Sequence, residues 1–135
     1  MMKRYGYWIC TVLLALWLTP SGVLDLMRVP GVLGILAHLG YPGYLGLILG
    51  AGKLLAVAAI LYPRTRLLRE WAYAGVTFDL LGAFISHCAV HDSIATRATP
   101  LVVLALAMGS YFLRPDRYRL RPILENARGS SLSVR

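Results

Sequence analysis

Long apolar segments constrain this chain more than any other feature. Hydrophobic residues make up 58% of its 135 residues, and they come in continuous blocks, unlike the one-sided stripes of soluble helices. Four blocks are long enough, at about 1.5 Å per helical residue, to cross or nearly cross a bilayer. They are Trp8 to Leu26, Tyr44 to Leu61, Trp71 to Val90 and Ile94 to Leu113. The sequence therefore predicts an all-α fold, an integral membrane four-helix bundle in a single domain over residues 1–135.

The first block also resembles a signal peptide, because Lys3 and Arg4 precede an apolar core. No A-x-A cleavage site follows, and the apolar character continues past Pro20, so we favour a retained and kinked helix. Residues 30–43 are mostly apolar and rich in glycine but too short to span a bilayer. We expect them to form an interfacial or re-entrant cap over the outer mouth of the bundle.

The basic residues indicate how such a bundle is oriented. The formal net charge is +8, and most Lys and Arg residues lie in the N-terminus, the 62–70 connection and the basic tail 114–135. Basic segments beside membrane spans stay on the cytoplasmic side, so both termini are predicted to be cytoplasmic. Because the charges flank the spans, we interpret them as a topology signal and predict no nucleic-acid binding. The polar tail beyond Arg114 is expected to be disordered.

Several classes of chemistry lack the residues they need. Cys10 and Cys88 are expected near opposite faces of the membrane, too far apart for a disulfide, and there is no CxxC pair. No nucleotide-binding loop, Ser-His-Asp order or paired catalytic carboxylate motif is present. The absence of a catalytic motif leaves enzymatic activity open, and the sequence fits a protein that is not an enzyme on its own.

Ionisable residues inside the apolar segments are the best candidates for a functional site, because such residues are rare and costly in a bilayer. Lys53 and Asp79 lie near the middle of the second and third segments, and we predict that they pair. With Asp25 and His87 they would form a polar track that opens outward and binds a small molecule, such as a quinone carbonyl pair, or relays protons. The alternative is a buried ion pair that only holds the helices together.

A metal site is the weaker interpretation of the third segment. His87 and His91 are four residues apart and Asp92 follows, a spacing that suits a metal on one helix face. His38 could add a ligand. Further ligands are lacking and these residues fall at the aqueous boundary, so we predict no metal site.

Glycines recur where helices could approach closely. Gly46 and Gly50 form a small-xxx-small pair with Gly52 beside it, and Gly75 and Gly82 are seven residues apart in the third segment. We interpret them as helix-packing positions, with close approach to a ligand as the alternative.

A series of short motifs resembles the DoxX-like family of small four-helix bacterial membrane proteins. The motifs cover most of the chain and are specific as an ordered series: Ser21 to Leu26, His38 to Pro42, Leu49-Gly50 with Lys53 to Leu55, Arg69 to Gly75, Phe78 to Ala83, Ser86-His87 and Pro100 to Val102. One position departs from the family pattern, which has Gly before the Asp at 92 where this chain has His91. This departure argues against a metal site, because a ligand that only this chain has would not serve a role shared by the family.

The resemblance implies a bundle in the bacterial inner membrane whose function is largely uncharacterised. Members of the wider DoxX group are linked to quinone-coupled sulfur oxidation and to oxidative-stress complexes. By analogy this implies an accessory subunit of a redox system, with a quinone as cofactor and a redox enzyme subunit as partner. The alternatives are a structural or assembly protein of the bilayer and a small transporter, which would need to form a homo-oligomer because four helices make a thin wall for a pore.

Overall fold

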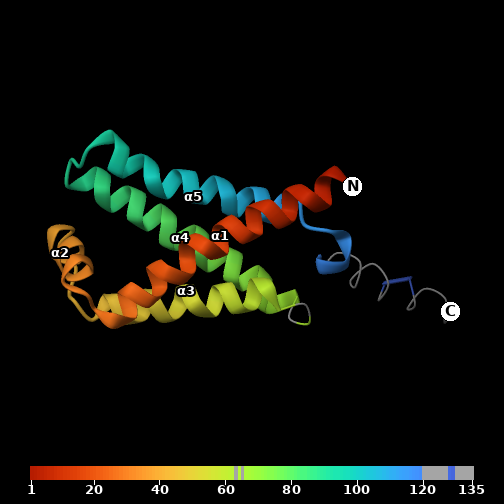
Figure 1. Ribbon diagram of the computed structural model, residues 1–135, viewed down its shortest axis with the longest axis horizontal. Coiled ribbons are helices and arrows are strands. Elements are labelled where there is room, and N and C mark those ends of the chain that lie inside the picture. The colour runs from red at the N-terminus through yellow and green to blue at the C-terminus, as the bar shows by residue number, and fades with distance from the viewer. Residues whose placement is uncertain (63, 65, 120–127, 130–135) are drawn as a thin grey trace.

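The protein is all-helical over the part of the chain that the computed structural model describes, residues 1–62, 64, 66–119 and 128–129. Five α-helices follow one another (Figure 1): α1 (Met2–Met27), α2 (Pro30–His38), α3 (Leu45–Leu61), α4 (Arg66–Ala89) and α5 (Ile94–Phe112). A short 3-10 helix, η1 (Asp116–Tyr118), comes after α5. The all-α prediction is confirmed.

The four long helices form a ring around one apolar core. Helix α1 packs against α3 and α5, and α4 packs against the same two helices from the other side. Each long helix contributes buried side chains to the core, among them Leu14, Leu18, Ile60, Val76, Leu80 and Val103. Helix α2 lies at one end of this ring, where it touches α3 (Figure 1). We refer to this end as the α2 end and to the opposite one as the N-terminal end.

The described residues contain five α-helices and not four, because the segment predicted as a cap is itself partly helical. Pro30 occupies the first position of α2, where a proline stabilises a helix start. Gly40, with φ of 81°, ends α2 in the left-handed conformation that glycine adopts without steric cost. Short apolar segments do not reveal by periodicity whether they are helical, so the sequence predicted only the position of this element.

Two long helices begin earlier than their apolar blocks. Helix α1 starts at Met2 instead of Trp8, and α4 starts at Arg66 instead of Trp71. Polar residues continue both helices beyond the hydrophobic part, and hydropathy marks only that part. Helix α1 also continues through Pro20 to Met27. As a result Arg69, predicted in a connecting loop, lies in the first turns of α4.

Among the described residues, two helices are long and apolar enough to cross a membrane by length and composition, namely α1 and α5. Helix α3 is apolar but has only 17 residues. Helix α4 has 24 residues, but polar side chains such as Asp79 and His87 lower its hydropathy. The other two predicted spans are therefore present as helices that do not meet the same criterion.

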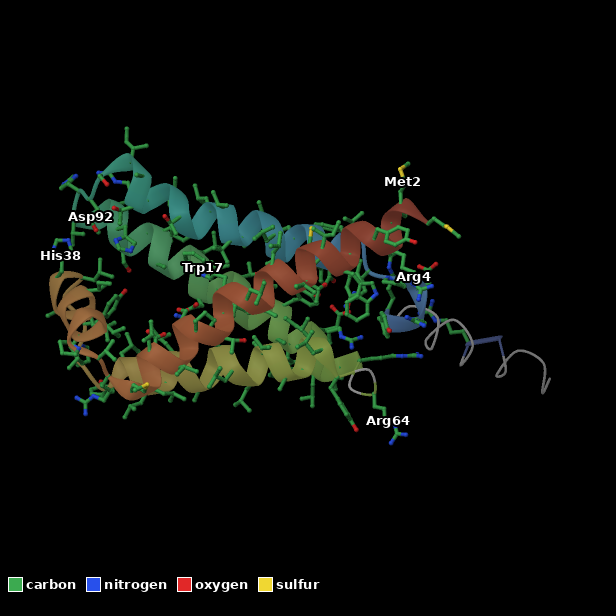
Figure 2. All side chains as sticks on the ribbon, viewed as in Figure 1. Met2, Arg4, Trp17, His38, Arg64 and Asp92 are labelled. Carbon is green, nitrogen blue, oxygen red and sulfur yellow. The ribbon has the colours of Figure 1, made fainter. Side chains whose placement is uncertain are left out.

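The first part of the C-terminal tail is ordered, which corrects the prediction of disorder beyond Arg114. Arg114 is only 5% exposed, and η1 places the Tyr118 ring 4.5 Å from the Arg69 guanidinium. The rest of the predicted disordered tail, 120–127 and 130–135, lies outside the described residues. Met2, Arg4 and Arg64 lie at the N-terminal end, opposite His38 and Asp92 (Figure 2).

Candidate functional site

The ammonium group of Lys53 is held between α1 and α3. Its Nζ donates hydrogen bonds to Asp25 Oδ2 at 2.7 Å and to Ser21 Oγ at 3.1 Å. The Lys53 and Asp25 side chains are 16% and 12% exposed, so most of this ion pair is inside the bundle. Asp79 was the predicted partner of Lys53, but the ion pairs of the described residues do not include this pair. Asp25 was in the predicted polar track, but Ser21 was missed.

Close packing of α1 on α3 explains why Asp25 is the partner. Gly46, Gly50 and Lys53 are spaced four and three residues apart, so they share one face of α3. A Cβ on Gly50 would lie 2.6 Å from the Gly22 carbonyl oxygen, so only glycine permits this approach of α1. The packing role predicted for Gly46 and Gly50 agrees with these contacts. The face that they share with Lys53 was a sequence signal that could have assigned Lys53 to α1, but the prediction did not use it.

A groove lies between α3 and α4, and we refer to it as the α3–α4 groove. Lys53 and Asp79 line it, together with apolar side chains that include Ile48, Leu55, Leu68, Trp71 and Val76. Its volume is about 430 Å³, and typical small-molecule sites occupy about 300–1,000 Å³. An apolar groove with two ionisable groups suits an amphiphilic molecule with a polar head.

Two glycines keep this groove open. Gly52 and Gly75 both line it, and a Cβ on either would meet no atom within 4 Å. They therefore do not serve the helix-packing role predicted for them and fit the alternative of close approach to a ligand. Gly82 also has open space around it but does not line the groove. These three positions allow side chains to be added at α3 and α4 without disturbing the core.

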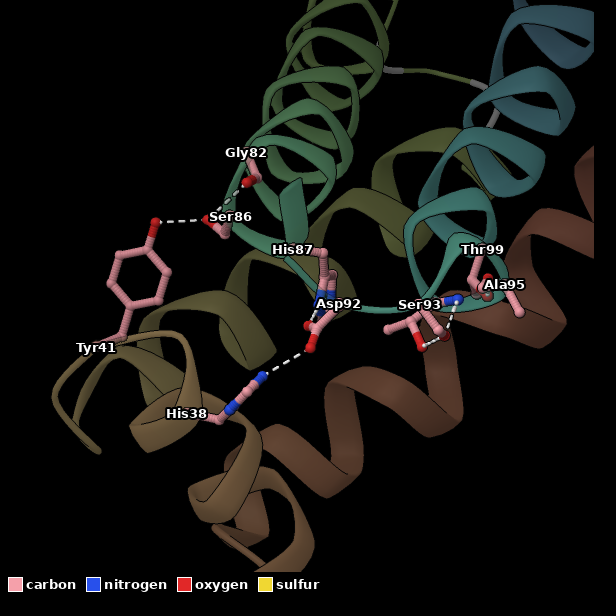
Figure 3. Close-up of polar contacts among 10 residues, drawn as sticks. His38, Tyr41, Gly82, Ser86, His87, Asp92, Ser93, Ala95 and Thr99 are labelled. Carbon is pink, nitrogen blue, oxygen red and sulfur yellow. Dashed lines mark hydrogen bonds and ion pairs between the residues drawn. The ribbon is translucent and has the colours of Figure 1, made fainter. Parts of the chain in front are cut away.

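His87 belongs to a second polar group at the α2 end (Figure 3). Its Nδ1 lies 2.6 Å from Asp92 Oδ2, and His38 Nε2 lies 2.7 Å from Asp92 Oδ1. Close by, the Tyr41 and Ser86 hydroxyls are 2.8 Å apart. The predicted polar track therefore divides into two, because Asp25, Lys53 and Asp79 lie at or beside the groove and His87 does not line it.

The end of α4 determines the arrangement of this second group. The helix ends at Ala89, and the Asp92 and His91 amides donate to the His87 and Cys88 carbonyls, a Schellman motif. His91 has φ of 58°, a left-handed conformation that favours glycine. His91 is therefore outside the helix and does not share a face with His87. No group of three or more potential metal ligands occurs among the described residues, and the cysteines are free.

Asp92 makes the stability of the α2 end depend on pH. Hydrogen bonds from His87 and His38 hold the pKa of its carboxyl below the ordinary value. A lowered folded-state pKa stabilises the structure above the unfolded value of about 3.9, and the effect is lost as the pH falls through the folded pKa. Spin labels on Gly34→Cys and Ile94→Cys, with Cys10 and Cys88 changed to Ser, should show a narrow distance distribution at pH 7 that broadens as the pH is lowered progressively below about 3.9. Asp92→Ala should broaden it already at pH 7, and an unchanged distribution in that variant would contradict the assignment.

The fold and the groove define a class of protein, a small helical bundle with long apolar helices and an amphiphilic groove between two of them. The model of the DoxX-like family matches residues 9–110. The chain belongs to the DoxX-like family, as the motif series indicated. No curated protein and no solved structure matches it.

Proposed function

We propose that this protein spans the bacterial inner membrane with α1, α3, α4 and α5 and has both termini in the cytoplasm. The basic Arg4 and Arg64 lie at the N-terminal end, which supports a cytoplasmic position for that end (Figure 2). Large apolar side chains on the outer surface support a lipid environment, since Leu16, Phe78 and Ile85 are 65%, 76% and 63% exposed. Membrane insertion would remove these side chains from water.

Within the membrane, the protein binds a lipophilic small molecule with a polar head in the α3–α4 groove. The observation that carries this proposal is the groove itself, in which Lys53 and Asp79 interrupt an otherwise apolar lining. A quinone couple has the required combination of a ring with polar oxygens and an apolar tail. In that case the protein serves as an accessory subunit that holds the molecule for a redox partner.

Filling the groove tests this function. Gly75→Leu places a side chain in the groove where a Cβ meets no neighbouring atom, and Gly82→Leu adds the same side chain to α4 outside the groove. We expect a lipophilic molecule to co-purify with the wild type and with Gly82→Leu, and at least about ten-fold less of it with Gly75→Leu, since the side chain occupies its space. Mass spectrometry of extracts from native membranes measures the retained amount.

The matched glycine variant separates loss of binding from loss of structure. Both variants should keep the helix content and the thermal unfolding midpoint of the wild type. Equal retention of the molecule by Gly75→Leu and Gly82→Leu would exclude the groove as its site. Retention of bulk lipid alone by the wild type would contradict the binding function.

A further inference from the structure

The Lys53 ammonium group retains one hydrogen-bond donor for a ligand. An ammonium has three N–H groups. Ser21 and Asp25 accept two of them, and the third has no acceptor among the described residues. Because Lys53 also lines the α3–α4 groove, this donor is available to a molecule in the groove. A ligand head group that contains an acceptor oxygen therefore satisfies it.

Asp79 needs a hydrogen-bond donor from a ligand, whereas Lys53 needs an acceptor. Its side chain lines the same groove and is half-buried near the middle of α4. The described part of the chain contributes no hydrogen bond to its carboxylate, and Asp25 already forms the ion pair with Lys53. An unpaired carboxylate in apolar surroundings costs free energy that a donated hydrogen bond recovers. Asp79 therefore favours a ligand that carries an O–H or N–H donor.

We propose that the α3–α4 groove selects amphiphiles whose head group is a hydroxyl on an apolar or aromatic body. The hydroxyl oxygen accepts from Lys53 while its hydrogen is donated to Asp79, so one small group satisfies both residues. A cationic amine would satisfy Asp79 but leave the Lys53 donor unmet and place a second positive charge beside Lys53. A ketone or an ester accepts from Lys53 but leaves Asp79 unpaired.

This inference rests on the proposed function and makes it more specific. For a quinone couple, the oxidised form carries only acceptors at its ring oxygens and the reduced form carries hydroxyls. The groove therefore prefers the quinol form over the quinone form. Trp71 and the aliphatic side chains of Leu55 and Val76 provide the apolar surface for the ring or the tail.

The experiment compares 4-nonylphenol with 4-nonylanisole, its O-methyl ether, which has the same body but no donor. Binding is measured by equilibrium dialysis against protein in phospholipid nanodiscs, with empty nanodiscs subtracted. We expect the wild type to bind the phenol at least about ten-fold more tightly than the ether, because a site that bonds a hydroxyl discriminates against analogues without it.

Two variants of Asp79 test whether its carboxylate causes the preference for the phenol. Asp79→Leu removes the acceptor, and the ratio of the two affinities should fall to about one. Asp79→Asn keeps a carbonyl acceptor, and a preference for the phenol should remain, which also keeps the test valid if the Leu variant does not fold. An unchanged preference in a folded Asp79→Leu variant would overturn the assignment.

Different results would overturn binding in the α3–α4 groove and selection of a hydroxyl head group. Equal binding of phenol and ether by the wild type, with both lost in Gly75→Leu, would overturn hydroxyl selection and leave the groove as a binding site. Binding of neither compound above empty nanodiscs would count against the groove and hydroxyl selection together. Binding of the phenol that Gly75→Leu does not change would place the hydroxyl site elsewhere and overturn the inference.

Discussion

Lys53→Met is expected to lower the free energy of unfolding by about 3–5 kcal/mol, the usual effect of removing one partner of a buried ion pair. The substitution keeps most of the side-chain volume but leaves Asp25 without its cation in a position where its side chain is 12% exposed. Unfolding in mixed SDS micelles measures the loss. Stability within about 0.5 kcal/mol of the wild type, the range of ordinary surface changes, would show that the pair contributes nothing.

The double variant Lys53→Met, Asp25→Leu is the control for this prediction. Replacing both charges by apolar side chains removes the unpaired group, and we expect most of the lost stability to return. The same variant distinguishes the proposed function from a structural role for the pair. If Lys53 only holds α1 against α3, the double variant should retain the bound molecule as the wild type does. If Lys53 contacts the ligand, the double variant should fold and release it.

Arg69→Met is expected to cost about 2–4 kcal/mol, because it removes two hydrogen bonds that a charged group donates to carbonyls at the end of α3. Arg69 is 1% exposed. Its Nε donates to the Ile60 carbonyl at 3.1 Å and its Nη2 to the Tyr62 carbonyl at 2.7 Å, at the C-terminal end of α3. A cation at this position also complements the helix dipole. Arg69 therefore ties the start of α4 to the end of α3.

Arg64→Met is a suitable comparison, because Arg64 is exposed in the same connection and has the same charge. Its effect should stay within about 0.5 kcal/mol. Arg69→Lys should not restore full stability, since a lysine lacks the planar fork that reaches two carbonyls and stacks on an aromatic ring. Similar unfolding curves for Arg69→Met and Arg64→Met would contradict the capping role.

The position of Arg69 was among the features that the sequence did not reveal. Basic residues in the 62–70 segment were attributed to a solvated cytoplasmic loop, and most basic residues near membrane spans are of this kind. In the part of the chain that the structure describes, two such residues are instead buried: Arg69, and Arg114, whose Nη2 lies 2.6 Å from Glu70 Oε1. The fold buries them because the end of α3 and the aromatic rings of Tyr111 and Tyr118 converge at the N-terminal end. Composition does not report such long-range convergence.

At the α2 end, too, the sequence predicted only part of the arrangement. Sequence spacing identified His87, His91 and Asp92 as a polar group, and His38 as a residue that could join it. The structure joins His38, Asp92 and His87 through hydrogen bonds but leaves His91 out. The reason is local, since the Schellman motif turns the chain into a left-handed conformation at His91. A helical spacing of four predicts a shared face only while the helix continues.

The sequence alone determined the helical class, the positions of the long helices, the family and the residues that are costly to bury. These follow from local properties, namely apolar blocks, ordered motifs and the rarity of charges among them. Only the tertiary structure decided the partner of Lys53, the role of each glycine and the location of the groove. These depend on how each helix is rotated about its axis, and a segment that is apolar all round does not encode its rotation. Contact of α1 with the Gly46 and Gly50 face of α3 fixes that rotation, which pairs Lys53 with Asp25 and leaves Asp79 in the groove without an ion-pair partner among the described residues.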